Sequence, residues 1–462
     1  MKKKPLSKMI TRFYGISDFG FNIMTGGMEV KYLVFFMTNV AKFSLVSIGI
    51  ATTVAAVIDA FMQPVYGGLM TGLKPMKWGR NRSWLVFMPV LVLITFVTMF
   101  TSIGPKNVGV IIVAASLCLT NAARTFPWLA HVNLITVMAN GPDERAKLAS
   151  IRGTWAAAGG IISSYVVLPL INFFASRLNN EVAGYTVVAF IVSLFYVITT
   201  WFTFWFTKGY EEVETDTAMI KAERVTVKDM LLSTAGNPPL LVLLIADFFK
   251  CMSGFVMSAS AAYYFTYIVR DMSLMPLYLF LGAIMSTLGA ASVAFIARKL
   301  GTKGAATLGV FGQGIAFTIC FFLARNVTLF FVCIIIARFF GGITNTSIVS
   351  LYTDCIVYSE WKTGKDTSAF IMATMTFALK LSYIARGTLV PAVLALVGFS
   401  ASIDPAVASE TMKIGILVAF LAIPGGVLLV SGLLLFFGYK LTKEKVLELQ
   451  TEIDARKAAV QG

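Results

Sequence analysis

The stretch SLVSIGIATTVAAVIDAFMQPVYGGLMTG, residues 44–72, contains a single charged residue, Asp59, in an otherwise apolar run. About 20 helical residues cross the roughly 30 Å hydrocarbon core of a bilayer, so this run is long enough to span it. A carboxylate inside hydrocarbon costs about 2.5 to 3.5 kcal/mol on insertion scales, and such acids usually face a partner or a wet cavity. Gln63, four residues on, shares a helical face with Asp59. The stretch therefore predicts a membrane helix with one functional face.

Similar apolar runs recur along nearly the whole chain of 462 residues, which is 57% hydrophobic and 13% charged and has a mean hydropathy of +0.80. This composition excludes a soluble multi-domain protein. The runs are too long and too uniformly apolar for barrel strands, so we expect an all-α membrane protein. The twelve expected spans are approximately 11–38, 44–72, 84–103, 108–139, 150–175, 183–206, 238–268, 274–297, 307–324, 327–358, 368–398 and 411–438.

The longest polar interval divides these spans into two sets of six. We expect one six-helix bundle at 1–206, a cytoplasmic linker at 207–237, a second bundle at 238–439 and a cytoplasmic tail at 440–462. The segments expected in the cytoplasm hold 25 Lys and Arg residues, and the outside loops hold five. This bias places both termini in the cytoplasm.

Several function classes do not fit the sequence. The net charge of +15 is spread over short loops rather than gathered on one face, so it reflects membrane topology and not nucleic-acid binding. The five cysteines lie in apolar segments without paired spacing, which favours packing over metal binding. There is one histidine, His131, and no nucleophile elbow or phosphate loop. We therefore expect no catalytic residues, no enzyme activity, no cofactor, no bound metal and no obligate protein partner.

Five charged residues in the expected spans predict a binding cavity: Asp18, Asp59, Arg124, Arg152 and Lys380. Their mixed signs suit a carbohydrate, whose hydroxyls both donate and accept hydrogen bonds and bind charged groups most strongly.

Aromatic side chains would cover the apolar faces of a sugar, and Trp128, Trp155 and Tyr383 are the candidates. The alternative is ordinary packing, because a chain with 38 Phe residues places aromatic rings throughout.

Six strings, in order, resemble the glycoside-pentoside-hexuronide:cation symporter family, which includes melibiose permease. They are YGISDFGFN (14–22), DAFMQP (59–64), WGRNR (78–82), DERAKLASIR (143–152), SEWKTG (359–364) and TFALKL (376–381). The resemblance implies the major facilitator fold, with twelve transmembrane helices in two pseudo-symmetric six-helix halves. It also implies alternating access around a central sugar site in a bacterial inner membrane, with a small-molecule glycoside as the partner.

The resemblance also implies roles for single residues. Asp18 and Arg152 match the carboxylate and the arginine that bind sugar hydroxyls, and Asn22 at the end of the first string is a further substrate-binding candidate. Asp59 matches the first acid of the cation site, and Lys380 matches a lysine beside that site.

The chain departs from the family pattern at two acids. Gln63 stands where the second acid of the cation site is expected, and Thr125 replaces an acid of the Asp-x-Pro-x-Trp pattern, with Trp128 one place early. Sodium needs several oxygen ligands, whereas one carboxylate can carry a proton. We therefore expect proton coupling through Asp59, Gln63, Thr125 and Lys380, with uncoupled uniport or exchange, and then sodium coupling, as the alternatives.

Two basic residues, Arg124 and His131, lie seven positions apart and so nearly on one helical face. They make the expected lining more cationic, which favours an anionic glycoside such as a hexuronide or a sulfonated sugar. Two alternatives stay open at this point. In the first, Arg124 would turn toward a neighbouring helix or His131 would cap a polar contact, so that the lining gains no charge. In the second, the substrate would be a non-sugar amphiphilic conjugate.

Overall fold

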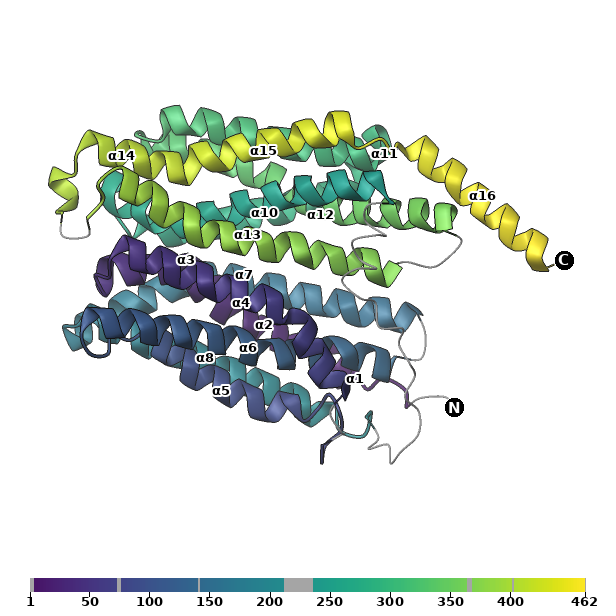
Figure 1. The fold of residues 1–462 in the computed structure, drawn as a ribbon, viewed down its shortest axis with the longest axis horizontal. Coiled ribbons are helices and arrows are strands. Elements are labelled where there is room, and N and C mark those ends of the chain that lie inside the picture. The colour runs from purple at the N-terminus through teal and green to yellow at the C-terminus, as the bar shows by residue number, and fades with distance from the viewer. Residues whose placement is uncertain are drawn as a thin grey trace. The chain divides into compact units, whose positions relative to one another are not determined.

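The computed structural model describes residues 4–72, 76–139, 142–211, 236–363, 368–400 and 403–461. These residues are almost entirely helical, and within them the only paired extended residues are Met76 and Gly79, which form an isolated bridge. The described chain is therefore all-α, as its composition predicts (Figure 1).

The chain folds into two compact units. The first consists of the described residues of Met1–Met219 with Asp271–Phe280 and Leu394–Val407, and the second of those of Ile220–Arg270, Leu281–Val393 and Ala408–Gly462. The bundle boundaries at 206 and 238 stay a prediction.

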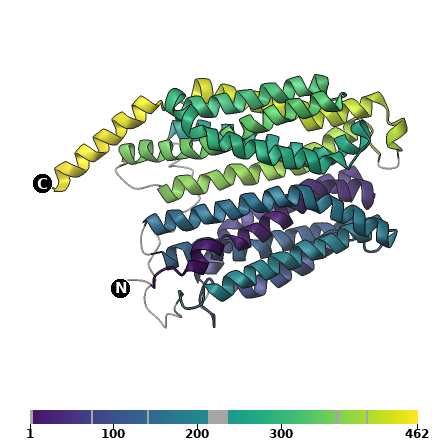
Figure 2. The ribbon, with the colours of Figure 1, turned by 180° about the vertical axis from the view of Figure 1, so that it is seen from behind.

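The N-terminal part of the chain forms α1 (Lys8–Phe13), α2 (Ile16–Met24), η1 (Thr25–Glu29), α3 (Val30–Phe35), η2 (Phe36–Val40), α4 (Leu45–Gly72), α5 (Trp84–Met99), α6 (Lys106–Met138), α7 (Pro142–Leu178) and α8 (Glu181–Phe206). The C-terminal part forms α10 (Pro238–Tyr264), η3 (Phe265–Val269), α11 (Leu274–Leu323), α12 (Val327–Thr363), α13 (Ser368–Leu396), η4 (Pro405–Val407), α14 (Glu410–Leu417), η5 (Val418–Ala422), α15 (Ile423–Leu433), η6 (Leu434–Gly438) and α16 (Lys443–Gln461). Both views show α16 extending away from the other helices of its unit (Figures 1 and 2).

Nine helical segments of the described chain are long and apolar enough to cross a bilayer. Three features account for the difference from the twelve expected spans. The first run contains the polar residues Asp18, Asn22, Glu29 and Lys31, which lower its hydropathy, and α5 has only 16 residues. The helix α11 has 50 residues, or about 75 Å at 1.5 Å per residue, and turns at Gly301, where φ is +72°. It therefore supplies two spans, and every expected span corresponds to helix in the structure.

The carboxylate of Glu211, which follows α8, holds the turn before α5 in place. Glu211 accepts hydrogen bonds from the Asn81 and Arg82 backbone N–H groups and from the Asn81 side chain, at 2.7 to 3.1 Å. The Arg82 guanidinium donates to the Phe204 carbonyl at 2.8 Å and lies 4.5 Å from the centroid of its ring. The basic turn is therefore tied to the C-terminal end of α8.

Next to this turn, the same end of the first unit has an apolar core. Trp84 of α5 stacks on Phe126 of α6 with 4.6 Å between ring centroids. Ala130 and Leu134, one and two turns further along α6, are fully buried in the same cluster as Tyr14. This core fixes the positions of α1, α5 and α6 next to the polar residues described below.

Gly79→Ala should destabilise the protein by about 1 to 3 kcal/mol, since Gly79 has φ +105° and a Cβ would lie 2.4 Å from a Glu211 oxygen. The unfolding midpoint of the purified protein in detergent measures this. Gly426→Ala in α15 is the matched control, because its Cβ meets nothing within 4 Å. It should leave the midpoint unchanged or raise it slightly. Equal midpoints for both variants would contradict the role of the turn.

Candidate functional site

Glycine residues let α2 approach α7 closely. A Cβ on Gly15 would lie 2.7 Å from the Ile151 carbonyl oxygen and 2.8 Å from the Arg152 Cα, and one on Gly159 would lie 2.6 Å from the Phe19 carbonyl oxygen. Small residues at such crossings allow membrane helices to pack backbone against backbone. The sequence of α2 therefore places its own polar residue, Asp18, directly beside α7.

Asp18 and Arg152 form a bidentate ion pair across this crossing. Arg152 Nε donates to Asp18 Oδ2 at 2.7 Å and Nη2 donates to Oδ1 at 2.6 Å. The two side chains are 8% and 14% exposed. Two parallel charge-assisted hydrogen bonds in a buried setting are stronger and more directional than a single contact. The two residues that the family resemblance assigns to the sugar site are thus brought together.

His131 of α6 joins the pair from a third helix. Its Nδ1 lies 3.4 Å from Asp18 Oδ2, and its Nε2 lies 2.8 Å from the Tyr14 carbonyl oxygen. Tyr14 in turn donates from its hydroxyl to the His131 carbonyl at 2.6 Å. The imidazole is 2% exposed, so it holds α1, α2 and α6 in register around Asp18.

A second buried ion pair joins Arg124 of α6 to Glu29 at the end of η1. Glu29 is 1% exposed, and its other oxygen, Oε1, has no hydrogen-bond partner among the described residues. Lys31, two residues further on, donates to the Ser164 hydroxyl of α7 at 3.1 Å. Arg124 therefore faces a neighbouring helix, and its pairing with Glu29 adds no net charge to the first unit.

Glu29 is not among the site residues that the sequence predicts. The residue lies 95 positions from Arg124 in the chain. A π-turn within an apolar run is a frequent feature of functional sites. The signal for it in the sequence is its charge within the first apolar run.

Other candidates lie around the Asp18 pair within the first unit. The Trp155 indole donates to the Arg12 carbonyl at 2.8 Å, and its ring contacts Phe13 and Phe19. Asn22 donates to the Asp18 carbonyl at 2.9 Å.

Two candidates on α6 differ in their exposure. Trp128 is 40% exposed, whereas Thr125 is buried and donates to the Asn121 carbonyl of its own helix at 2.8 Å.

Asp59 lies on α4 and is 6% exposed. Its carboxylate is near enough to the Tyr66 hydroxyl and the Cys118 thiol to interact with both electrostatically. The backbone of Gln63 continues α4, but its side chain lies outside the described part of the structure. Among the described residues, no group of three or more His, Cys, Asp and Glu side chains is arranged to hold a metal ion.

Lys380 and Tyr383 belong to α13 in the second unit. Tyr383 packs against Phe255 with 4.4 Å between ring centroids, and the Arg386 guanidinium lies 4.7 Å from the Tyr383 ring. Arg386 is 3% exposed, and two of its nitrogens have no hydrogen-bond partner among the described residues.

The second unit also contains a buried acid. Asp247 of α10 accepts from Lys250 at 3.1 Å and from the Tyr352 hydroxyl of α12 at 3.0 Å. The pair with Lys250 joins residues three apart on one helix, and the hydrogen bond from Tyr352 links α10 to α12. Both are structural contacts.

The geometry of the first unit suits recognition of a polar solute. A carboxylate accepts hydrogen bonds and a guanidinium donates them, and both groups reach the same point from two helices. A hydroxylated ligand could replace one of the two hydrogen bonds between Asp18 and Arg152, and its hydroxyls would then keep both charged groups hydrogen-bonded. Among the residues described around this pair, no nucleophile is paired with a general base, and the arrangement supports binding rather than covalent chemistry.

Comparison with known proteins matches residues 13–443 to the family model described as MFS/sugar transport protein. The chain is 24% identical over 457 residues to a glucuronide carrier protein homolog of Escherichia coli (strain K12), covering 97% of this chain and 96% of that protein. It is 24% identical over 397 residues to an isoprimeverose transporter of Lactiplantibacillus pentosus, covering 84% and 80%. A crystal structure of the nucleoside transporter NupG matches with a TM-score of 0.66 at 13% identity, covering 94% of this chain and 100% of that one.

Asp18→Asn and Arg152→Gln should each cost about 3 kcal/mol or more, because each leaves a buried charge uncompensated. The double variant should cost about 1 to 3 kcal/mol less than the sum of the single variants. The free energies of unfolding of the unmodified protein, the two single variants and the double variant, measured in detergent micelles, give this double-mutant cycle. Arg325→Gln is the control, since Arg325 and Glu410 form an exposed pair, with side chains 64% and 59% exposed. Additive losses would show that the buried pair does not act as a unit.

Proposed function

Because the chain belongs to the family of MFS/sugar transport proteins, we propose that it carries a glycoside across the bacterial inner membrane in symport with a proton. The family consists of membrane transporters, so the chain is a transporter and not an enzyme. Alternating access of two helical halves, with both termini in the cytoplasm, is the proposed mode of transport. The buried Asp18–Arg152 pair is the observation that carries the proposal for the substrate.

The Asp18–Arg152 pair supports binding of sugar hydroxyls. Asp18 is the acceptor for two N–H groups of Arg152, and a vicinal diol offers the same two-point geometry to either residue. Trp155, half-buried one turn from Arg152, offers an apolar face for the ring of the sugar. Together these side chains provide the polar and apolar contacts that a glycoside needs.

An anionic glycoside is the proposed substrate class. A carboxylate or sulfonate on the sugar would take the place of Asp18 on the Arg152 fork and leave Asp18 to accept hydroxyls. In this exchange Arg152 keeps an ionic partner, and Asp18 keeps His131 Nδ1 at 3.4 Å and gains hydrogen bonds from the sugar hydroxyls. The glucuronide carrier homolog among the relatives supports this class, whereas the isoprimeverose transporter makes a neutral sugar the alternative outcome. Arg124 does not enter this argument, because it pairs with Glu29 and not with the Asp18 carboxylate that Arg152 and His131 contact.

Proton coupling through Asp59 is the proposed energy source. Asp59 is a buried single carboxylate on α4, and one carboxylate suffices to bind and release a proton. A sodium ion prefers several oxygen ligands, and the family's second acid is replaced by Gln63. Lys380 remains a candidate for the charge that stabilises ionised Asp59 during the transport cycle.

Acidic glycosides should compete at least about tenfold better than neutral galactosides for uptake of a labelled glucuronide, because Arg152 discriminates by charge. Competition assays in cells that express the protein measure this ratio. Asp18→Asn and Arg152→Ala should abolish binding of the labelled compound, whereas Arg325→Gln should retain it. Stronger competition by the neutral galactoside would overturn the anionic class but not the assignment of the site.

Asp59→Asn should abolish accumulation of substrate against its gradient while exchange of labelled for unlabelled substrate continues, because an amide cannot release a proton. Membrane vesicles with imposed proton or sodium gradients separate the two coupling ions. In the unmodified protein, a proton gradient alone should drive accumulation. If only sodium drives it, proton coupling is wrong, and if neither does, the protein is a uniporter or an exchanger.

A further inference from the structure

A basic pocket of about 530 Å³ lies in the second unit, where α11 turns at Gly301 and meets the start of α16. Four of its lining residues are cations and one is an acid: Arg298, Lys299, Lys303, Lys443 and Glu444. Hydrogen bonds from its own backbone N–H and from the Thr442 hydroxyl lower the pKa of Glu444, so this acid is ionised at neutral pH. The pocket therefore carries three net positive charges and attracts an anion.

The N-terminus of α16 contributes to this pocket. Thr442 caps the helix by accepting a hydrogen bond from the Lys445 backbone N–H, and Thr442, Lys443 and Glu444 all line the pocket. The N-terminal N–H groups of this helix of 19 residues carry a partial positive charge, and two of them already donate within the helix, Glu444 N–H to its own carboxylate and Lys445 N–H to Thr442. The start of α16 therefore contributes Lys443 to the lining of the pocket.

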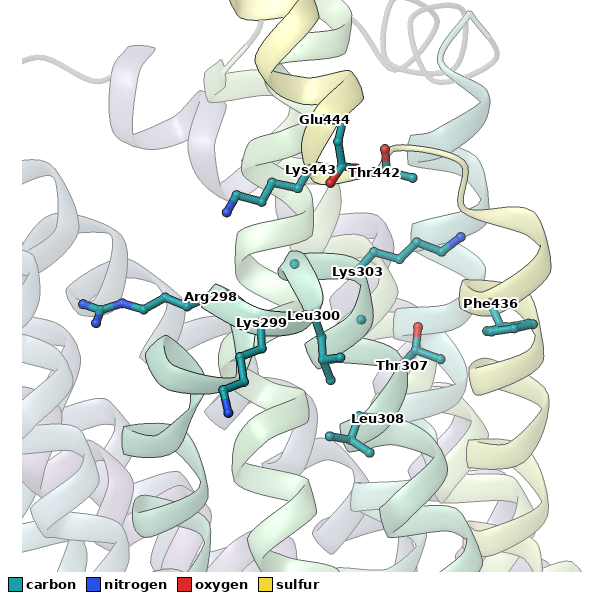
Figure 3. Close-up of a pocket in the computed structure, with 12 residues that line it drawn as sticks. Arg298, Lys299, Leu300, Lys303, Thr307, Leu308, Phe436, Thr442, Lys443 and Glu444 are labelled. Atoms are coloured by element: carbon teal, nitrogen blue, oxygen red, sulfur yellow. The ribbon is translucent and has the colours of Figure 1, made fainter.

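A buried hydroxyl supplies an independent observation that points to a ligand. Thr307 is 8% exposed, lines the pocket, and has no hydrogen-bond partner for its Oγ1 among the described residues. Buried polar atoms are usually hydrogen-bonded, so such an orphaned hydroxyl is typical of a site that receives a polar group. Figure 3 shows Thr307 and the Lys303 side chain on the side of the pocket where Phe436 lies, while Arg298, Lys299 and Lys443 project to the other side.

The walls of the pocket identify the kind of anion. Leu300, Leu308 and Phe436 line it and are 55%, 41% and 55% exposed, at the ends of helices apolar enough to span a membrane. A free phosphate gains nothing from such walls, whereas the acyl chains of a lipid would cover them. Basic pockets between transmembrane helices at the cytoplasmic side suit anionic headgroups.

The turn that forms the pocket is held in place from α12. Asp354 accepts a hydrogen bond from the Thr302 hydroxyl at 2.7 Å, immediately before Lys303. The left-handed conformation of Gly301 reverses the chain between the two spans of α11 and sets Lys299 and Lys303 on either side of the turn. The pocket is thus a feature of the folded backbone and not only of flexible surface side chains.

We propose that this pocket binds the phosphate of an anionic phospholipid headgroup from the leaflet on the predicted cytoplasmic side, with Lys303 and Thr307 as its ligands beside the start of α16. Phosphatidylglycerol has the required chemistry, since it combines one phosphodiester charge with two acyl chains. Bound lipid would link the turn of α11 to the start of α16.

Native mass spectrometry of the purified full-length protein, exchanged into detergent with defined lipids, tests the proposal. The unmodified protein should retain phosphatidylglycerol over zwitterionic phosphatidylcholine. The variant K303Q/T307V should retain about fivefold less phosphatidylglycerol, and Thr307→Ser should retain as much as the unmodified protein because it keeps the hydroxyl. Lys440→Gln is the matched control, since Lys440 is exposed nearby but does not line the pocket.

Three results would overturn the proposal. Equal retention of the two lipids would exclude recognition of an anionic headgroup. An equal loss in Lys440→Gln and K303Q/T307V would assign the effect to general surface charge. Displacement of bound lipid by millimolar inorganic phosphate, with no dependence on the acyl chains, would assign the pocket to free phosphate. A monodisperse profile in size-exclusion chromatography shows that each variant is folded.

Discussion

The bidentate pair between Asp18 and Arg152 is the interaction on which the site in the first unit depends. It joins α2 to α7, and through His131 it also joins α6. Hydrocarbon offers no water to solvate a charge, so each buried ion must find its partner within the protein. A pair of this kind contributes little net stability, but it makes one arrangement of the three helices much more favourable than arrangements that separate the charges.

The backbone makes this pair possible. Gly15 and Gly159 bring α2 and α7 close enough for Asp18 to reach the Arg152 fork without strain. A side chain larger than hydrogen at either position would push the helices apart and lengthen both hydrogen bonds. Close packing and electrostatics therefore act together, because the glycines determine whether the ion pair can form.

The need of each buried ion for a partner also explains the Arg124–Glu29 pair. This pair changes the net charge expected for the first unit. On the sequence, Arg124 and His131 add two cations to one face of a helix. In the structure Glu29 neutralises Arg124, and His131 is held between Asp18 and the Tyr14 carbonyl. In the proposed function, the Arg152 fork rather than an excess of positive charge is then the feature that distinguishes an acidic sugar from a neutral one.

Much of this protein follows from its sequence alone. The apolar runs, the scattered basic loops and the ordered strings determined an all-helical membrane transporter of the sugar-transport family, because the length and hydropathy of a span are local properties of the chain. The sequence also shows which charged residues lie within the apolar runs. What only the tertiary structure decided is the partner of each charge: Glu29 meets Arg124 across 95 residues, and Thr302 meets Asp354 across 52. Such contacts depend on helix crossings and on turns at single glycines, and no local pattern in the sequence encodes which helix faces lie together.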